Sequence, residues 1–518
     1  MKDALKVHIK SNYKYYIILL ALALMHIVLF FLCCAEDIIN YDSSYQYFLT
    51  LHDFDEIFRL LPEDYSPPFY AVILKLWTML FGETLIVMRS LSLVAMLGMA
   101  FIALFPVRAA FGNKTAIVSS LLFAFSSLNF TLIREIRPTV FAFFLVTAGA
   151  VYFYLSFFRE YRYSYICMTV FSVLAMYTHN VGMLSMLSFY IIAIIFSICT
   201  KRYDKMRKFF ISGAICAVVY IPWLIVVLKQ FGNVLNNYWK GTDPTLSKIL
   251  SWSVWSNFIG SENNILLLFV ILLITAAVLI VTFCKILNNS KKKNGEKTEK
   301  ECKNPDIKQY LIKSLFVVLL FVGPVVTLVC FCEFVYPIIT ARYFYIFAGI
   351  ALLIIALIIV HCDNKIVQFV FVGVISVNMA LSVYNTKVLQ DESDFSKMIT
   401  YIDSDSEGQP AFLHSHEWTL GIFMYYFPDA KHYIYDGTWC VLNTYDVFSG
   451  DVIDIGAVEN IKNYEDSFYV IDMHFPDTDE PVTDSLRRYE DFEFADCGVY
   501  TESYTFLKKW LLVKVESI

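Results

Sequence analysis

Long apolar segments constrain this chain more than any other feature of its sequence. Several of them reach the roughly 18 to 20 residues that a helix needs to cross the hydrocarbon core of a bilayer. Buried helices of soluble proteins seldom remain apolar over that length. In addition, only 17% of the 518 residues are charged, and 58% are hydrophobic. The chain is therefore predicted to be a polytopic α-helical membrane protein.

We expect about eleven transmembrane helices, with ends uncertain by a few residues. They are predicted at 15–34, 84–106, 115–133, 139–158, 164–180, 182–200, 209–228, 264–286, 310–332, 342–361 and 365–384. The run from Pro67 to Phe81 is shorter. It begins with two prolines, which suit the first turn of a helix because that turn needs no amide donors. We expect it to be an interfacial or half-inserted helix, with a twelfth span as the alternative.

Basic and acidic residues alternate between successive loops. Lysines precede the first span, and the clusters at 201–208 and 291–293 fall on the same side. The loop with Glu36, Asp37 and Asp42 falls on the other side. Because Lys and Arg are enriched in cytoplasmic loops, the N-terminus is predicted to be cytoplasmic, and an odd number of spans places the C-terminal tail outside. The expected location is the plasma membrane, crossed many times.

The tail from about residue 385 differs in composition from the rest of the chain. It contains roughly 26 acidic and about 9 basic residues, the balance of a solvated module. Its pattern predicts strands at 410–414, 431–435, 467–473, 494–500 and 505–515, and helices at 391–403, 416–427 and 480–490. Such alternation is typical of a small α/β domain. The tail lacks the glycine-rich motifs of nucleotide-binding proteins.

Polar residues gather at the outer ends of several predicted spans. They are Asp42, Arg89, Glu135, Arg137, His179, Arg342 and Tyr343. Ionisable residues at the ends of apolar helices are costly and tend to be functional. A carboxylate among arginines suits a reaction with an acidic base and an anionic leaving group, because guanidinium binds phosphate through two parallel hydrogen bonds.

Each of these residues also has a simpler interpretation. An outer arginine often anchors a helix end to lipid headgroups, and His179 by itself fits an interfacial polar residue. Arg134, Glu135 and Arg137 could form a local ion pair only, which contributes little at an exposed surface. The whole set at one depth is harder to explain in this way. Composition by itself does not distinguish an enzyme from a transporter.

Several short motifs resemble those of one family in the order in which they occur there. Tyr41-Asp42-Ser43-Ser44-Tyr45 resembles the aromatic-Asp-Glu-x-aromatic motif in the first external loop of GT-C membrane glycosyltransferases. The closest match is the family 39 type, which includes protein O-mannosyltransferases and lipid A aminoarabinose transferases. Further resemblances lie at 66–70 (His-Pro-Pro-Leu-Tyr in the family), 87–91, 134–138 (Gln-Glu-Ala-Arg-Met), 177–179 (Tyr-Thr-His) and 342–343 (Arg-Tyr).

The resemblance implies a GT-C-like transmembrane domain at 1–384, with a first external loop at 35–83, and an extracytoplasmic α/β domain at 385–518. It also implies an inverting hexosyl- or pentosyltransferase. Such an enzyme takes a sugar from a polyprenyl-phosphate donor and passes it to a hydroxyl of a protein, glycan or lipid acceptor at the outer face. Membrane lipids would be further partners, and no nucleic acid is expected.

The same resemblance implies roles for individual residues. Asp42 would be the general base, and Arg137 and Arg342, together with Arg89, would stabilise the departing phosphate. Glu135 would be a second catalytic residue that orients hydroxyl groups. The remaining two residues, His179 and Tyr343, would contact the substrate.

The chain departs from the family pattern at two positions. Ser43 replaces the second acid of the Asp-Glu pair, and Ser66 replaces the histidine before the two prolines. A metal site that used those side chains would be lost, so no metal or other cofactor is expected to be required. Ser43 also leaves open an inactive relative. From another class, a transporter or flippase of lipid-linked sugars could use the same arginines to bind a phosphate headgroup.

Overall fold

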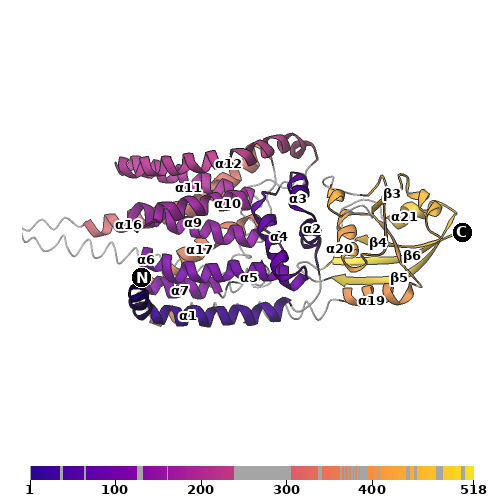
Figure 1. Ribbon diagram of the computed structural model, residues 1–518, viewed down its shortest axis with the longest axis horizontal. Coiled ribbons are helices and arrows are strands. Elements are labelled where there is room, and N and C mark those ends of the chain that lie inside the picture. The colour runs from indigo at the N-terminus through magenta and orange to yellow at the C-terminus, as the bar shows by residue number, and fades with distance from the viewer. Residues whose placement is uncertain are drawn as a thin grey trace, which may run out of the picture.

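The computed structural model shows a helical bundle with a mixed α/β domain at one end (Figure 1). It describes residues 2–34, 39–62, 66–124, 126, 132–159, 161–237, 305–336, 341–361, single positions within 365–384, 394–406, 408–438, 444–448, 452–473, 482–502 and 508–518. The predicted span at 264–286 lies outside these residues.

Long apolar helices form the bundle. They are α1 (Lys2–Cys34), α5 (Leu85–Ile102), α9 (Thr139–Phe158), α10 (Ser164–Thr178), α11 (Asn180–Cys199), α12 (Tyr203–Asn237), α16 (Pro305–Phe334) and α17 (Ala341–His361). Helix α5 continues through η1 (Ala103–Val107) and α6 (Arg108–Phe111), and α7 (Asn113–Ala124) follows. Within the described ranges, seven helices are long and apolar enough to cross a membrane. This confirms the prediction of a polytopic membrane protein.

Helix α9 is the centre of the bundle, and 94% of its most apolar stretch is buried. Its Phe157 packs against Phe196 of α11 and Phe316 of α16, at centroid distances of 5.2 and 5.1 Å. On another side, Gly349 of α17 lies so close to Thr147 of α9 that a side chain at 349 would collide with it. The absent Cβ thus lets α17 approach α9, and the outer ends of both helices meet at one place.

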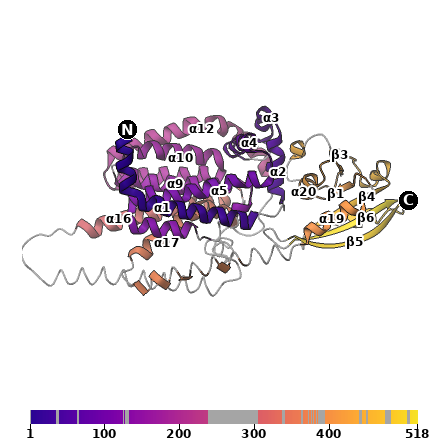
Figure 2. The same cartoon turned by 60° about the horizontal axis from the view of Figure 1, so that its bottom comes forward.

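Three short helices lie between the bundle and the C-terminal domain (Figures 1 and 2). They are α2 (Tyr41–Leu51), α3 (Phe54–Leu60) and α4 (Phe69–Phe81). Helix α4 has 13 residues, too few to cross a bilayer, and ends at Gly82 with φ +99°. Its Leu76, Met79 and Leu80 are exposed. These features suit a helix that lies at the membrane surface.

The C-terminal domain contains one six-stranded sheet in the order β3-β2-β1-β4-β6-β5. Its strands are β1 (Ala411–His414), β2 (Lys431–Ile434), β3 (Val452–Asp454), β4 (Ser467–Met473), β5 (Phe492–Glu502) and β6 (Lys508–Ser517). The first four are parallel where they pair, and β6 runs antiparallel to both β4 and β5. Its other elements are α19 (Phe395–Asp405), α20 (Glu417–Tyr426), α21 (Val482–Leu486), η2 (Thr444–Phe448) and η3 (Val458–Asn463). The predicted α/β class is confirmed.

Candidate active site

Helix α2 places Asp42 in its first turn. Asn40 caps the helix, since its side-chain oxygen accepts a hydrogen bond from the amide of Ser43 at 2.9 Å. A carboxylate in the first turn is favoured there, because the N-terminal end of a helix is electropositive. The preceding residue, Ile39, is fully buried and fixes the entry to the helix. The local sequence thus determines where the acid stands.

Two arginines from distant parts of the chain hold Asp42. Arg137, in the loop before α9, forms an ion pair with Oδ1, and Nη1 of Arg342, at the start of α17, lies 3.1 Å from Oδ2. Side-chain exposure is 31% for Asp42, 20% for Arg137 and 45% for Arg342. Solvent therefore still reaches the cluster, and a charged ligand could reach it too.

The loop that carries Arg137 is fixed by hydrogen bonds from two helices. Arg89 of α5 is 2% exposed, and its Nε donates to the carbonyl of Arg134 at 3.0 Å. Ser92 Oγ, one turn further along α5, donates to the carbonyl of Glu135 at 3.0 Å. From α2, Ser43 Oγ accepts the amide of Ile136 at 3.2 Å. Arg89 thus lies beneath the loop and supports it.

In the sequence, Ser43 stands out only because it departs from the family pattern. The structure gives it a definite place, fully buried between α2 and the loop before α9. Its hydroxyl satisfies a buried amide that would otherwise cost free energy. No sequence pattern points to this bond, because it joins residues that meet only through the fold.

Glu135 is buried beside the Asp42 cluster, with 5% exposure. Burial raises the pKa of its carboxyl, while the charges of Arg137 and Arg342 act against that rise. Tyr70 of α4 is 1% exposed and lies within the electrostatic range of Glu135 and Arg137. Its hydroxyl has no hydrogen-bond partner among the described residues. Tyr70 had no predicted role, although it ends the motif at 66–70.

His179 and Tyr343 lie side by side near the arginines. Their rings are in edge contact at 5.8 Å. His179 caps α11, and its Nδ1 accepts the amide of Val181 at 3.1 Å, so any proton on the neutral ring is on Nε2. Burial, followed by the charges of Arg137 and Arg342, lowers the pKa of His179. The imidazole is therefore uncharged at neutral pH.

The arrangement suits proton transfer next to an anion. It combines an accessible carboxylate, two guanidinium groups, a buried carboxyl with a raised pKa and a neutral imidazole. Among the residues that the structure describes, no three His, Cys, Asp or Glu side chains gather as metal ligands would. The expectation that no metal is required stays a prediction.

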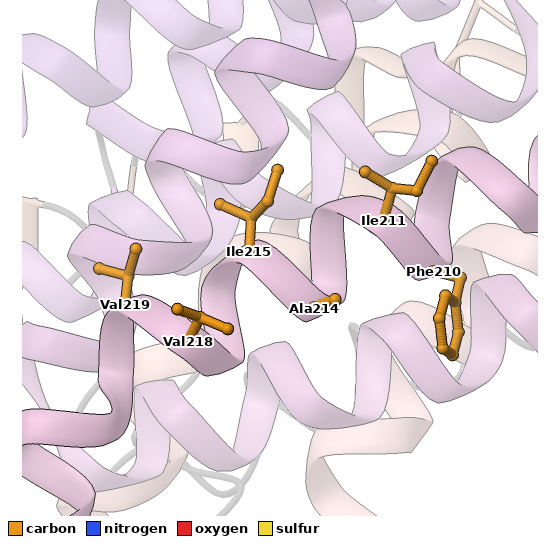
Figure 3. A pocket seen from close by; sticks show the side chains of 6 residues that line it. All are labelled: Phe210, Ile211, Ala214, Ile215, Val218 and Val219. Atoms are coloured by element: carbon orange, nitrogen blue, oxygen red, sulfur yellow. The ribbon is translucent and has the colours of Figure 1, made fainter.

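An apolar recess lies on one face of α12 (Figure 3). It is lined by Phe210, Ile211, Ala214, Ile215, Val218 and Val219. All of these residues come from one helix, and most are exposed. Such a face suits contact with lipid chains and offers no polar group for chemistry.

Known proteins share the fold of this chain. A family model described as dolichyl-phosphate-mannose-protein mannosyltransferase matches residues 65–226. ArnT from Cupriavidus metallidurans in the apo state has a TM-score of 0.61 and 9% identity, covering 97% of this chain and 98% of that chain. ArnT bound to undecaprenyl phosphate has a TM-score of 0.57 and 11% identity, covering 96% and 98%. No curated protein sequence matches the chain.

The chain therefore has the fold of the GT-C superfamily of membrane glycosyltransferases, as its motifs predicted. Its architecture is like that of ArnT. The likeness covers nearly the whole of both chains, and it includes the helical bundle and the C-terminal α/β domain.

Proposed function

We propose that this protein is a glycosyltransferase that moves a sugar from a polyprenyl-phosphate donor to an acceptor hydroxyl at the outer face of the membrane. One observation carries the proposal: Asp42 is held between Arg137 and Arg342 at the end of a GT-C bundle. The ArnT structure with undecaprenyl phosphate supports a lipid phosphate as the carrier of the donor sugar. The description of the matching family supports the same chemistry.

Asp42 is the proposed general base. It takes the proton of the acceptor hydroxyl while the acceptor oxygen forms a bond to the anomeric carbon of the sugar. The bond from that carbon to the phosphate oxygen breaks, and the electron pair leaves with the polyprenyl phosphate. Attack from the face opposite the phosphate inverts the anomeric centre.

Arg137 and Arg342 are the proposed phosphate ligands. Their guanidinium groups offer forked hydrogen bonds and stabilise the negative charge that develops on the leaving group. Both arginines are paired with Asp42. A bound phosphate would compete for them and release Asp42 for the acceptor. We therefore propose that the donor binds first.

Three further residues orient the substrates in this proposal. Glu135, with its raised pKa, can donate a hydrogen bond to a sugar oxygen, and neutral His179 can donate from Nε2. Tyr343 packs against His179 and keeps the ring in place. Arg89 acts through the loop before α9, which it supports at Arg134.

Purified full-length protein in liposomes, given labelled polyprenyl-phosphate sugar and an extract of cell-envelope acceptors, tests the proposal. The wild type should release polyprenyl phosphate and label an acceptor, whereas a flippase would leave the sugar–phosphate bond intact. Asp42→Asn should reduce transfer to background, while Asp55→Asn, an exposed acid on the neighbouring helix α3, should not. Turnover of Asp42→Asn at the wild-type rate would remove Asp42 from the role of base.

A further inference from the structure

Helix α2 has two supports, one on each side (Figure 2). Towards the bundle, Asp42 contacts Arg137 and Arg342, and Ser43 accepts the amide of Ile136. Towards the C-terminal domain, α2 packs against α20 and η2. The position of the carboxylate relative to the arginines therefore depends on both contacts, and the second belongs to a domain far away in the sequence.

Aromatic side chains form most of the second contact. Tyr41, Tyr45 and Phe48 follow one another at about one helical turn, so they share a face of α2. All three touch the ring of Phe448 in η2, at centroid distances of 6.4, 6.4 and 5.3 Å. Ring pairs at such distances stabilise the contact between the two elements beyond the area that they bury. One side chain of the C-terminal domain thus contacts two turns of the helix.

Polar contacts fix both ends of α2 to the same domain. The amide of Ile39, just before the helix, donates to the hydroxyl of Tyr426 at 3.2 Å. At the other end, Nε2 of His52 donates to the carbonyl of Val447 at 2.8 Å. These bonds start from the backbone before the N-cap and from the side chain of the C-cap residue. Rotation or sliding of α2 would break both.

Gly421 marks the closest approach of the two helices. A Cβ atom at this position would lie 2.8 Å from Ser44 Oγ and 3.0 Å from the ring of Phe448. Glycine inside a helix is less stable than alanine, so the close contact is a physical reason for its presence. Ser44 Oγ also donates to the carbonyl of Tyr41 at 2.8 Å. A displacement of Ser44 would therefore move the turn that contains Asp42.

We infer that the C-terminal domain positions the catalytic base, and that Gly421 is a positioning residue which sets the distance between α20 and α2. The inference rests on the proposed function only in treating Asp42 as the base. The contact itself does not depend on the reaction. A larger residue at 421 pushes α2 away from α20 and moves Asp42 relative to Arg137 and Arg342.

Transfer kinetics of full-length variants test the effect on the reaction. Gly421→Val should lower kcat roughly tenfold or more, because small displacements of a catalytic group are costly. Donor KM should stay within about twofold, since the arginines that bind phosphate belong to the bundle. Gly421→Ala should cause a smaller loss, and adding Ser44→Ala should restore most of it by removing the nearest clashing atom. Gly408→Ala is the matched control, because a Cβ at 408 meets nothing within 4 Å.

Hydrogen exchange provides a measurement that does not require activity. In Gly421→Val, amides of α2 should exchange faster while those of β4 stay protected, and Ser44→Ala should reverse the change in Gly421→Ala. Unchanged kcat together with unchanged protection of α2 would overturn the inference, as would a loss of kcat that Ser44→Ala leaves unrepaired. If the wild type transfers no sugar, the proposed function fails, whereas the exchange result still decides whether Gly421 positions α2.

Discussion

Single residues at this site act through bonds that join separate parts of the chain. Ser43 is the clearest case, because it occupies the position of a family acid and yet is fully buried. Its hydroxyl accepts the amide of Ile136 and so connects the helix of Asp42 to the loop of Arg137. The absence of the second acid is thus accompanied by a structural role for the serine.

Substitution of Ser43 should therefore affect stability and activity together. Ser43→Ala leaves a buried amide without its acceptor, which costs about 1–3 kcal/mol, and we expect a lower thermal midpoint and a reduced kcat. Ser43→Glu should be worse, since the site has no room or solvent for a charged side chain. Thermal unfolding and transfer assays on both variants check this. An active, stable Ser43→Glu protein would contradict it.

Glu135 gives a prediction about pH. Burial raises the pKa of its carboxyl, so the protonated form persists to higher pH than for an ordinary glutamate. If that form donates a hydrogen bond, transfer should fall as pH rises through the raised pKa. Glu135→Gln, which keeps a donor at every pH, should retain activity within a few-fold and lose this fall. The measurement is kcat against pH for both proteins, and an inactive Glu135→Gln enzyme would instead indicate a charged role.

At the scale of elements, the sequence was most informative where a pattern is long or repeated. Apolar length predicted the spans, and alternation predicted five strands close to their observed bounds, such as 467–473 for β4. The three-residue edge strand β3 was missed because it is too short for its two apolar residues, Val452 and Ile453, to show an alternating pattern. The sequence predicted that Asp42, Arg137 and Arg342 lie at one depth. It did not show the contacts that bring them together, such as that of Gly349 with Thr147, which places α17 against α9.

Strands β1 and β2 contain a pair of buried histidines that makes the C-terminal domain sensitive to acid. Nδ1 of His414 lies 3.0 Å from Thr419 Oγ1, Nε2 of His414 lies 2.9 Å from Nδ1 of His432, and Nε2 of His432 lies 3.1 Å from the carbonyl oxygen of Phe427. Both rings are fully buried, and a charge on one lies next to the other. Burial and His432 accordingly lower the pKa of His414 well below 6.5.

Stability of the domain should therefore fall at low pH. The unfolded state takes up a proton near pH 6.5 and the folded state only at lower pH, so the contribution is complete above about 6.5 and is lost as pH falls below it. Hydrogen exchange of β1 and β2, corrected for intrinsic rates, should show weaker protection at about pH 5 than at about pH 7.5. His432→Leu should be less stable at neutral pH but less dependent on pH. Equal protection at both pH values would refute this.

At the scale of the whole molecule, the two ends of the bundle differ in charge. Arg108 begins α6, which lies at the end remote from the C-terminal domain (Figure 1), and donates to Asn12. Arg159 donates to the carbonyl of Ala110 in α6, and Arg202 donates to the carbonyl of Phe157 at the end of α9. By the preference of basic residues for the cytoplasm, we expect that end to face inward and the Asp42 cluster to face outward.

This orientation can be measured in intact cells. A reactive tag placed after Ile518 should be labelled by a reagent that does not cross membranes, whereas a tag before Met1 should be labelled only after permeabilisation. The second tag serves as the control for leaky cells. Labelling of the N-terminal tag alone would reverse the topology and place the site in the cytoplasm.

Because α9 is deeply buried, the guanidinium groups of Arg137 and Arg342 differ in how firmly they are held. Arg137 lies two residues before α9, which is the most deeply buried of the described membrane-spanning helices. The side chain of Arg137 is 20% exposed, whereas that of Arg342 is 45% exposed. We expect a lipid phosphate to meet a fixed guanidinium group at Arg137 and a guanidinium group at Arg342 that changes its rotamer on binding. The phosphate would then contact Arg342 first and Arg137 second. The final position of the donor would therefore depend little on the direction from which the lipid enters.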